Sequence, residues 1–330
     1  MKKAAEFIKS HDSFIAASHL NPEGDAIGAL LGIAAIIEKS GKTCLTYNGD
    51  PVPPNTAFLA GSDKIINEID KVPKADAAIL LDCGDLERPG EDFKKIALPL
   101  PLLNIDHHGT NTEFGTVNWV DPQASSTGEM IVRLAEYMGI GPGPEAALAL
   151  YTAVLTDTGS FQYNNTTAEA LKAAARMVEA GARPEVAADN YYHRIPASNL
   201  VLLAKCLDTL EFNSEQTRGD MVLSNDMMEE TNTGPEAAEG FVNYITDVAT
   251  VKVAVLIREQ GDGSWKLSMR SKGEIDVAEI AARYNGGGHR NAAGCRIKGG
   301  LEEVKKTIRQ EIDREIAKIK QSGQSDGKEA

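Results

Sequence analysis

Residues 101–109 read Pro-Leu-Leu-Asn-Ile-Asp-His-His-Gly, an apolar run of strand length that stops abruptly at an acid and two histidines. Four more runs of this length occupy residues 13–18, 43–48, 77–82 and 116–120. Helix-like spacing of apolar residues alternates with these runs, over residues 25–39, 126–138, 144–156 and 167–180. This alternation predicts an α/β domain in which helices cover both faces of a mostly parallel sheet.

The pattern changes after residue 181. Strand-like runs then occupy residues 220–224, 250–258, 264–270 and 294–297, and helix-like runs occupy residues 183–193, 197–210, 235–244, 276–284 and 301–320. The mixture predicts a second, smaller α+β domain. We expect the first domain at residues 1–185, a helical linker at 186–211, the second domain at 212–320 and a disordered tail at 321–330.

Length and composition suit a globular protein of two domains, because 330 residues exceed one ordinary core. No apolar run reaches the roughly 18 residues of a membrane span, and the N-terminus lacks the pattern of a secretory signal. The four cysteines, Cys44, Cys83, Cys206 and Cys295, are far apart and form no C-x-x-C pair. These features predict a cytoplasmic protein with reduced thiols and no membrane association.

The net charge is −14, the opposite of what a protein that binds long duplex nucleic acid usually shows. The charge is uneven, however. Residues 252–298 hold nine Lys and Arg against five Asp and Glu, a local net charge of +4, so the rest of the chain carries −18. An acidic body with one basic segment favours a short anionic ligand.

Polar residues follow several predicted strands and one predicted helix, in segments 18–25, 81–85, 105–109 and 155–159. In parallel sheets, ligands bind outside the carboxyl ends of the strands, so one site could gather these segments. The candidate metal ligands that they supply are His19, Glu23, Asp25, Asp82, His107 and Asp157. Any one segment alone could be a turn or a structural polar residue, whereas four in this order favour a functional site.

Carboxylates and imidazoles crowded together repel or desolvate one another unless a cation neutralises them. Oxygen ligands with two histidines suit Mn²⁺ best, with Mg²⁺, Fe²⁺ and Zn²⁺ as alternatives. Six ligands are too many for one ion with open positions, and they suit two ions that share a bridging carboxylate. The sequence therefore predicts a two-metal centre.

A glycine-rich segment, Gly286-Gly-Gly-His-Arg-Asn-Ala-Ala-Gly294, lies in the second domain. Its glycines let the backbone approach an anion closely, and Arg270 with Ser271 at the end of a predicted strand adds further donors. We interpret the glycine-rich segment together with Arg270 and Ser271 as a phosphate-binding site.

In the first domain, Ser126 with Glu129 three residues later is a capping box, which predicts a helix start that supports the metal site.

These motifs together resemble the DHH phosphoesterase family with its associated DHHA1 domain, over about residues 19–297. The nearest branch is the bacterial enzymes that degrade very short RNA (nanoRNA) and dephosphorylate 3′-phosphoadenosine 5′-phosphate (pAp). The resemblance implies one metal held by His19, Glu23 and Asp82. It implies a second metal held by Asp25, Asp82, His107 and Asp157, with Asp82 bridging. The family usually has Asp where this chain has Glu23, so we expect an altered first metal site that still binds.

The resemblance also assigns catalytic roles, with His108 facing the scissile phosphate and Asp106 supporting the histidines. Substrate would be held by Arg270, Ser271, Gly287, Gly288 and His289, opposite the metals. We expect this protein to hydrolyse nanoRNA and pAp in the cytoplasm. Members of the family are often homodimers, so a homodimer is a further expectation. Two alternatives stay open: a hydrolase of cyclic or linear dinucleotides such as c-di-AMP, pApA or pGpG, and a nucleotide-binding regulator without catalysis.

Overall fold

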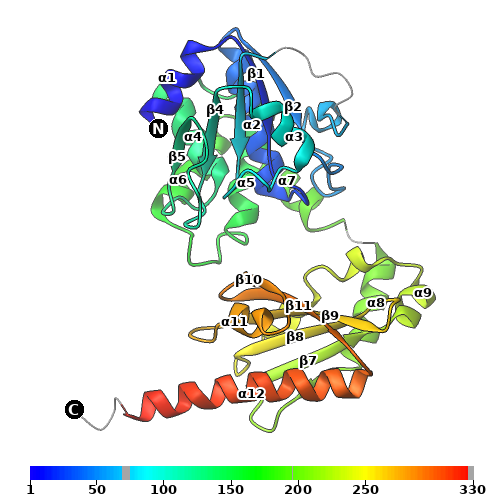
Figure 1. The fold of residues 1–330 in the computed structure, drawn as a ribbon. Helices are drawn as coiled ribbons and strands as arrows, with labels where there is room; N and C mark the ends of the chain where they lie inside the picture. The colour runs from blue at the N-terminus through cyan, green and yellow to red at the C-terminus, as the bar shows by residue number, and fades with distance from the viewer. Residues whose placement is uncertain (69–74, 195, 326–330) are drawn as a thin grey trace. The chain divides into compact units, whose positions relative to one another are not determined.

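The computed structural model describes residues 1–68, 75–194 and 196–325, and the chain divides into two compact units, Met1–Arg194 and Ile195–Ala330 (Figure 1). The predicted linker segment is divided between them. Helix α7 (Pro184–Tyr191) packs with the first unit and α8 (Ala197–Leu207) contributes to a core of the second. No helix in the described part of the chain is both long and apolar enough to cross a membrane.

The first unit is built on a five-stranded sheet in the order β2-β1-β3-β4-β5, with every neighbouring pair parallel. Its strands are β1 (Ser13–Ala17), β2 (Thr43–Tyr47), β3 (Ala77–Leu81), β4 (Leu102–Asp106) and β5 (Val117–Val120). All five residues of β3 and of β4 are buried, because a parallel sheet is covered on both faces. The predicted α/β class and the five strands are confirmed.

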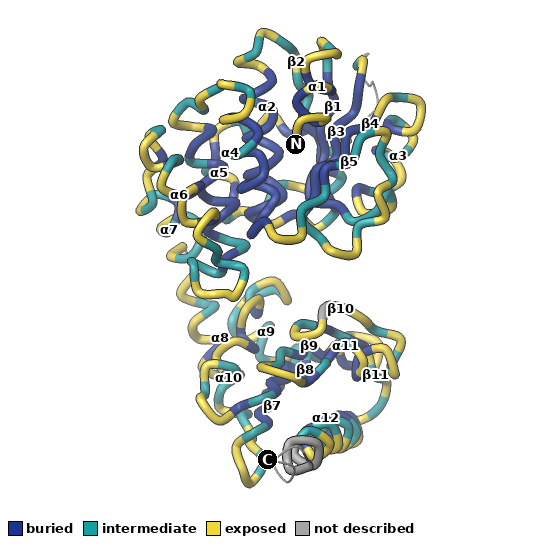
Figure 2. The backbone as a smooth tube through the Cα atoms, turned by 90° about the vertical axis from the view of Figure 1, so that its left-hand side faces the viewer, coloured by how far each residue is buried: buried dark blue, intermediate teal, exposed yellow. Residues whose placement is uncertain are grey.

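Helices cover both faces of this sheet, as predicted. The remaining helices of the unit are α1 (Lys2–Ser10), α2 (Gly24–Lys39), α3 (Glu91–Ala97), α4 (Thr127–Met138), α5 (Pro144–Asp157) and α6 (Ala168–Glu179), with a 3₁₀ turn η1 (Ser62–Lys64). Helices α1, α2, α4, α5 and α6 share one core with one face of the sheet, and α3 packs on the other face. Figure 2 shows the buried backbone concentrated in the sheet and in α2, α4 and α5.

Helices α2 and α5 approach closely because α2 carries glycine at every fourth position. An added Cβ would lie 2.4 Å from the Thr156 hydroxyl at Gly24, 2.4 Å from the Ala149 carbonyl at Gly28, and 2.3 Å from Leu150 at Gly32. Residues four apart lie on one face of a helix, so the three glycines form a single contact surface. This surface brings the first turn of α2 against the last turn of α5.

The second unit contains a six-stranded sheet in the order β10-β11-β9-β8-β7-β6. Its strands are β6 (Glu211–Phe212), β7 (Arg218–Leu223), β8 (Val253–Glu259), β9 (Ser264–Ser271), β10 (Gly287–His289) and β11 (Ala292–Lys298). Strands β7 and β8 pair in parallel and all other pairs are antiparallel. The glycine-rich segment therefore includes strand β10, which pairs with β11.

Helices cover the two faces of this second sheet unequally. They are α9 (Asn225–Thr231), η2 (Pro235–Ala238), α10 (Phe241–Thr246), α11 (Val277–Ala282) and α12 (Leu301–Ser325), in addition to α8. Helices α11 and α12 share a core with one face, and α8, η2 and α10 share a core with β7 and β8 on the other. Strands β9 and β11 lie outside that second core.

Helix α12 continues to Ser325, past residue 321, where we expected a disordered tail to begin. The buried stripe of Val304, Ile308, Ile312 and Ile316 anchors this helix. Once a helix is anchored, each added residue gains a backbone hydrogen bond, so the helix extends beyond its buried part. The rest of the predicted tail, residues 326–330, lies outside the described residues.

Candidate metal centre

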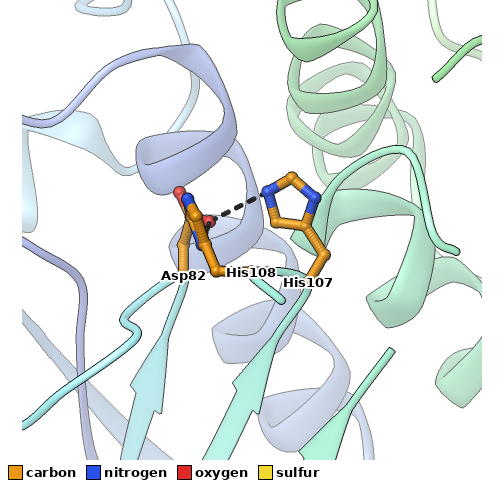
Figure 3. Close-up of side chains that lie close together, drawn as sticks. All are labelled: Asp82, His107 and His108. Atoms are coloured by element: carbon orange, nitrogen blue, oxygen red, sulfur yellow. Dashed lines mark ion pairs between the residues drawn. The ribbon is translucent and has the colours of Figure 1, made fainter. Parts of the chain in front are cut away.

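Asp82 is the centre of a group of acids and histidines at the carboxyl edge of the first sheet. It follows β3 directly, its φ is +56°, and it is 2% exposed. Asp and Asn tolerate this left-handed backbone better than most residues. The two carboxylate oxygens face in different directions: Oδ2 lies 3.4 Å from His19 Nε2, and Oδ1 lies 3.4 Å from His107 Nε2. Figure 3 shows Asp82 and His107 facing each other.

The first donor group consists of His19, Glu23 and Asp82. His19 follows β1, and its Nε2 lies 3.0 Å from Oε1 of Glu23, the N-cap residue of α2. The His19 Nδ1 lies 2.8 Å from the Leu20 carbonyl oxygen, which can only accept a hydrogen bond. The neutral ring therefore carries its proton on Nδ1 and presents the Nε2 lone pair to a metal.

The second donor group consists of Asp25, His107 and Asp157. These residues come from the first turn of α2, the end of β4 and the last residue of α5. His107 Nε2 lies 4.0 Å from Asp25 Oδ2 and 3.6 Å from Asp157 Oδ2. All six predicted ligand positions thus lie in these two donor groups. One histidine of each group, His19 or His107, lies 3.4 Å from a different oxygen of Asp82.

The N-terminus of α4 holds two of these acids. The Asp25 carboxylate accepts hydrogen bonds from the backbone N–H groups of Thr127 and Gly128, both at 2.8 Å, and the Thr127 hydroxyl donates to Asp82 Oδ1 at 3.2 Å. Ser126 caps the helix by accepting from the Glu129 N–H at 3.0 Å, as predicted. Positive dipole ends of helices stabilise carboxylates, so α4 supports the site electrostatically.

His108 is oriented by a chain of polar side chains. Its Nδ1 lies 2.7 Å from Asp106 Oδ1, and the Asn111 side-chain amide donates to Asp106 Oδ2 at 2.6 Å and to Asn104 Oδ1 at 2.8 Å. Asn104 and Asn111 were not among the predicted site residues. The one signal for Asn104 was its position as a polar residue inside the apolar run of residues 101–106.

Electrostatics at the site favour protonated histidines when no cation is bound. Burial disfavours the charged form of His19, but the carboxylates of Asp82 and Glu23 outweigh burial and raise its pKa to about 10. Burial likewise opposes the charge on His107, and Asp82, Asp25 and Asp157 raise its pKa to about 10. The hydrogen bond that His108 donates to the Asp106 carboxylate raises the pKa of His108 above its usual value.

The pKa of one acid of the site, Asp82, is lowered, whereas the pKa values of Asp25 and Asp157 are raised. Burial would raise the pKa of Asp82, but His107 and His19 outweigh it and hold that pKa well below its usual value. Burial, followed by the charges of Asp82 and Asp157, raises the pKa of Asp25 well above its usual value. Burial raises the pKa of Asp157 to about 6. Buried carboxylates that repel one another in this way form a donor set that fits divalent cations.

The five predicted substrate-binding residues all lie in the second unit. Arg270 and Ser271 end β9, and Gly287, Gly288 and His289 make up β10. In the sheet register, His289 pairs with Ala292, and Ala292 pairs with Arg270. The Ser271 hydroxyl donates to the Ile275 carbonyl oxygen at 2.7 Å and accepts from the Asn291 amide at 2.9 Å, so it also stabilises the loop that follows β9.

Comparisons with known proteins identify the domain families of both units. Residues 13–159 match the DHH family N-terminal domain, and residues 221–318 match the DHHA1 domain. The chain is 32% identical to the bifunctional oligoribonuclease and PAP phosphatase NrnA of Thermus thermophilus, over 95% of both chains. It is 26% identical to NrnA of Bacillus subtilis, over 88% of this chain and 91% of that protein.

More distant similarity extends to a cyclic-di-AMP phosphodiesterase, GdpP, of Geobacillus thermodenitrificans, which is 25% identical over 93% of this chain and 48% of that protein. Among solved structures, an exopolyphosphatase-related protein of Bacteroides fragilis superposes with a TM-score of 0.88 at 27% identity, covering 95% of both chains. The matched domains, the near full-length similarity to NrnA and the fold together place this chain in the DHH family, in the group that carries a DHHA1 domain.

Proposed function

We propose that this protein is a metal-dependent phosphodiesterase that degrades very short RNA to mononucleotides and dephosphorylates pAp. The observation that carries the proposal is the position of Asp82, whose two oxygens lie 3.4 Å from His19 and from His107, one histidine in each donor group. One carboxylate placed in this way suits a bridge between two cations. The similarity to proteins named oligoribonuclease and PAP phosphatase supports the choice of substrate.

We assign the six ligand positions as the sequence predicted them. His19, Glu23 and Asp82 would hold one cation, and Asp25, Asp82, His107 and Asp157 would hold the other. Mn²⁺ is the proposed ion, since carboxylates mixed with imidazoles suit it, and Mg²⁺ is the first alternative. When bound, a cation pair supplies Lewis-acid stabilisation of the phosphoryl oxygens and makes water a nucleophile near neutral pH.

The other residues would bind and orient the substrate. The Asp106 carboxylate accepts a hydrogen bond from the Nδ1–H group of His108. When the His108 ring is protonated, its Nε2–H group would donate to a phosphate oxygen. Arg270, Ser271, Gly287, Gly288 and His289 would hold the phosphate that is not cleaved or the terminal nucleotide. Positioning of this kind accounts for a large share of the rate gain in phosphoryl transfer.

A substrate panel tests the proposal. With Mn²⁺ present, we expect mononucleotides from RNA of two to about five nucleotides and inorganic phosphate from pAp, with much slower turnover of long RNA. Product analysis by chromatography distinguishes these outcomes. The similarity to a cyclic-di-AMP phosphodiesterase makes a dinucleotide-signal hydrolase the second candidate. Preferential cleavage of c-di-AMP, pApA or pGpG would favour that candidate, and no hydrolysis of any member would refute both.

Metal binding is expected to release protons. Because the pKa values of His19 and His107 are about 10 in the metal-free site, both rings are protonated at pH 7. A metal ligand must be deprotonated, so we expect at least the two histidine protons to leave when both sites fill at pH 7, and affinity to rise with pH toward 10. Calorimetric Mn²⁺ titration in two buffers of different ionisation enthalpy measures this number. If the heat of Mn²⁺ binding were the same in both buffers, no protons would be released and the prediction would be contradicted.

The same pKa values set the pH dependence of the metal-free fold. The raised pKa of each histidine contributes stability that is fully present below pH 6.5, the ordinary value, and that is lost as the pH rises through about 10. The raised pKa of Asp157, about 6, acts in the same direction, because its ionisation costs stability as the pH rises from 3.8 through about 6. Both contributions should disappear when Mn²⁺ saturates the site.

Asn111→Ala is expected to lower turnover about 10- to 100-fold, the effect usual for residues that orient metal-site groups. The substitution removes the amide that donates to Asp106 Oδ2, so His108 loses its fixed orientation. The matched control is Asn118→Ala, since the Asn118 amide donates to the carbonyl oxygens of Glu113 and Gly115 in a turn. Equal losses of activity in both variants would show that Asn111 acts only through folding.

A further inference from the structure

Three cations lie side by side on one face of the second sheet. In the antiparallel register, Arg258 of β8 pairs with Lys266 of β9, and Lys266 pairs with Arg296 of β11. Directly opposed residues of antiparallel strands project to the same face with Cβ atoms about 5 Å apart, and like charges there are destabilising. This row of cations is on the face opposite to α11 and α12, because Leu267, between Lys266 and Ser268, is buried in their core.

Little within the unit compensates these charges. The Arg296 guanidinium lies 3.5 Å from Asp262 Oδ2 and donates to Gln260 Oε1 at 3.1 Å. Over the residues that the structure describes, neither Arg258 nor Lys266 forms a side-chain hydrogen bond or an ion pair. Burial, followed by the charge of Arg296, lowers the pKa of Arg258. The row is compensated only in part, by Asp262 at Arg296 and by the charge of Glu236 near Arg258, so an anion that binds to it would stabilise it.

A cavity of about 200 Å³ adjoins the row. Its polar lining includes Arg258, Lys266, Ser268 and Arg270, with Glu239 as the one acid. Its apolar wall is formed by Leu256 together with residues of η2 and α10. Cations and a hydroxyl on one side and an apolar wall on the other suit a sugar-phosphate unit, whose charge and apolar ring faces need both.

Arg270 is already proposed to hold substrate, and Lys266 lies four residues before it on the same strand. At about 3.3 Å per residue their backbone positions are about 13 Å apart, so the row of cations extends the positively charged lining along β9 beyond Arg270. We propose that Arg258, Lys266 and Arg296, with Ser268, form a second phosphate subsite that binds the backbone of a single-stranded oligonucleotide beyond the nucleotide at Arg270. This inference rests on the proposed function for the identity of the strand.

The test is binding of a fluorescent pentanucleotide RNA to the full chain in the presence of a chelator, over a range of salt concentrations. We expect Arg258→Gln/Lys266→Gln to weaken pentanucleotide binding about tenfold or more and to lower the salt-dependence slope by about two. Affinity for pAp and for a dinucleotide should change by less than about twofold, because these ligands end before the subsite. The melting temperature should stay the same or rise, since the row of like charges is shortened.

The matched control is Lys306→Gln/Arg314→Gln, which removes the same charge from exposed positions on α12. An equal loss of pentanucleotide affinity in the control, an unchanged affinity in the test variant, or an equal loss for the dinucleotide would each overturn the subsite. Displacement of the pentanucleotide by inorganic phosphate at equal phosphate concentration would show a site for free phosphate and overturn the strand assignment. Because binding is measured without turnover, the test remains decisive even if the protein hydrolyses no RNA.

Discussion

Asp82→Asn should reduce turnover on a dinucleotide by at least about a thousandfold while the protein stays folded. The substitution replaces one carboxylate oxygen with an amide nitrogen, which cannot ligate a cation. Because each Asp82 oxygen faces a different donor group, either orientation of the amide removes one half of the bridge. Asparagine tolerates the left-handed backbone at this position, so the effect on the fold should be small.

Kinetics and Mn²⁺ stoichiometry should change together in this variant. We expect calorimetry to show fewer than two bound ions, and circular dichroism to show an unchanged fold. Asp85→Asn is the matched control, since Asp85 is in the same loop and its carboxylate accepts only from the backbone N–H groups of Glu87 and Arg88 among the described contacts. Near-normal turnover by Asp82→Asn would exclude the proposed metal centre.

Gly28→Val should lower the free energy of unfolding by about 3 kcal/mol, the upper end for overpacked cores. The added Cβ would lie 2.4 Å from the Ala149 carbonyl oxygen, so α2 and α5 must separate. The separation also moves the start of α2 away from the end of α5, where Asp25 and Asp157 lie. Metal affinity should therefore fall in addition to stability.

Thermal and urea unfolding of the metal-free protein measure the first effect, and a loss of about 3 kcal/mol corresponds to a decrease of about 6–12 °C in the melting temperature. Gly261→Val is the control, because an added Cβ at Gly261 meets no atom within 4 Å. A melting temperature that falls equally in both variants would attribute the effect to valine itself. Unchanged stability of Gly28→Val would show that the two helices can repack.

Buried parallel strands were the most predictable part of the fold. Runs such as residues 77–82 and 101–106 are apolar on both faces, and this property is visible in the sequence. Helices α1 and α3 were missed because they are short, with nine and seven residues, and depend on packing more than on their own propensity. Strand β10 was missed because its glycines carry no apolar pattern and its pairing with β11 is a tertiary contact.

Some residues of the candidate site were also predictable from the sequence, and others were not. Its acids and histidines were recognisable because ligand-type residues cluster in short segments after predicted strands and at the end of one predicted helix, and the structure brings all six positions together. Asn111 was not recognisable, since its contact with Asp106 depends on the path of the loop after β4. The row formed by Arg258, Lys266 and Arg296 depends on strand register, which the spacing of these residues along the chain does not reveal.

The attachment of Asp25 to the start of α4 matters for anyone who wants to transplant this centre into another scaffold. Copying the six side chains would leave the Asp25 carboxylate without the two N–H groups that orient it. Residue 128 must also remain glycine in the copy, because a Cβ there would lie 2.4 Å from Ala153 Cβ and 3.2 Å from Asp25 Oδ1. The smallest transferable unit therefore includes the helix start at residues 126–128 as well as the residues that would bind metal.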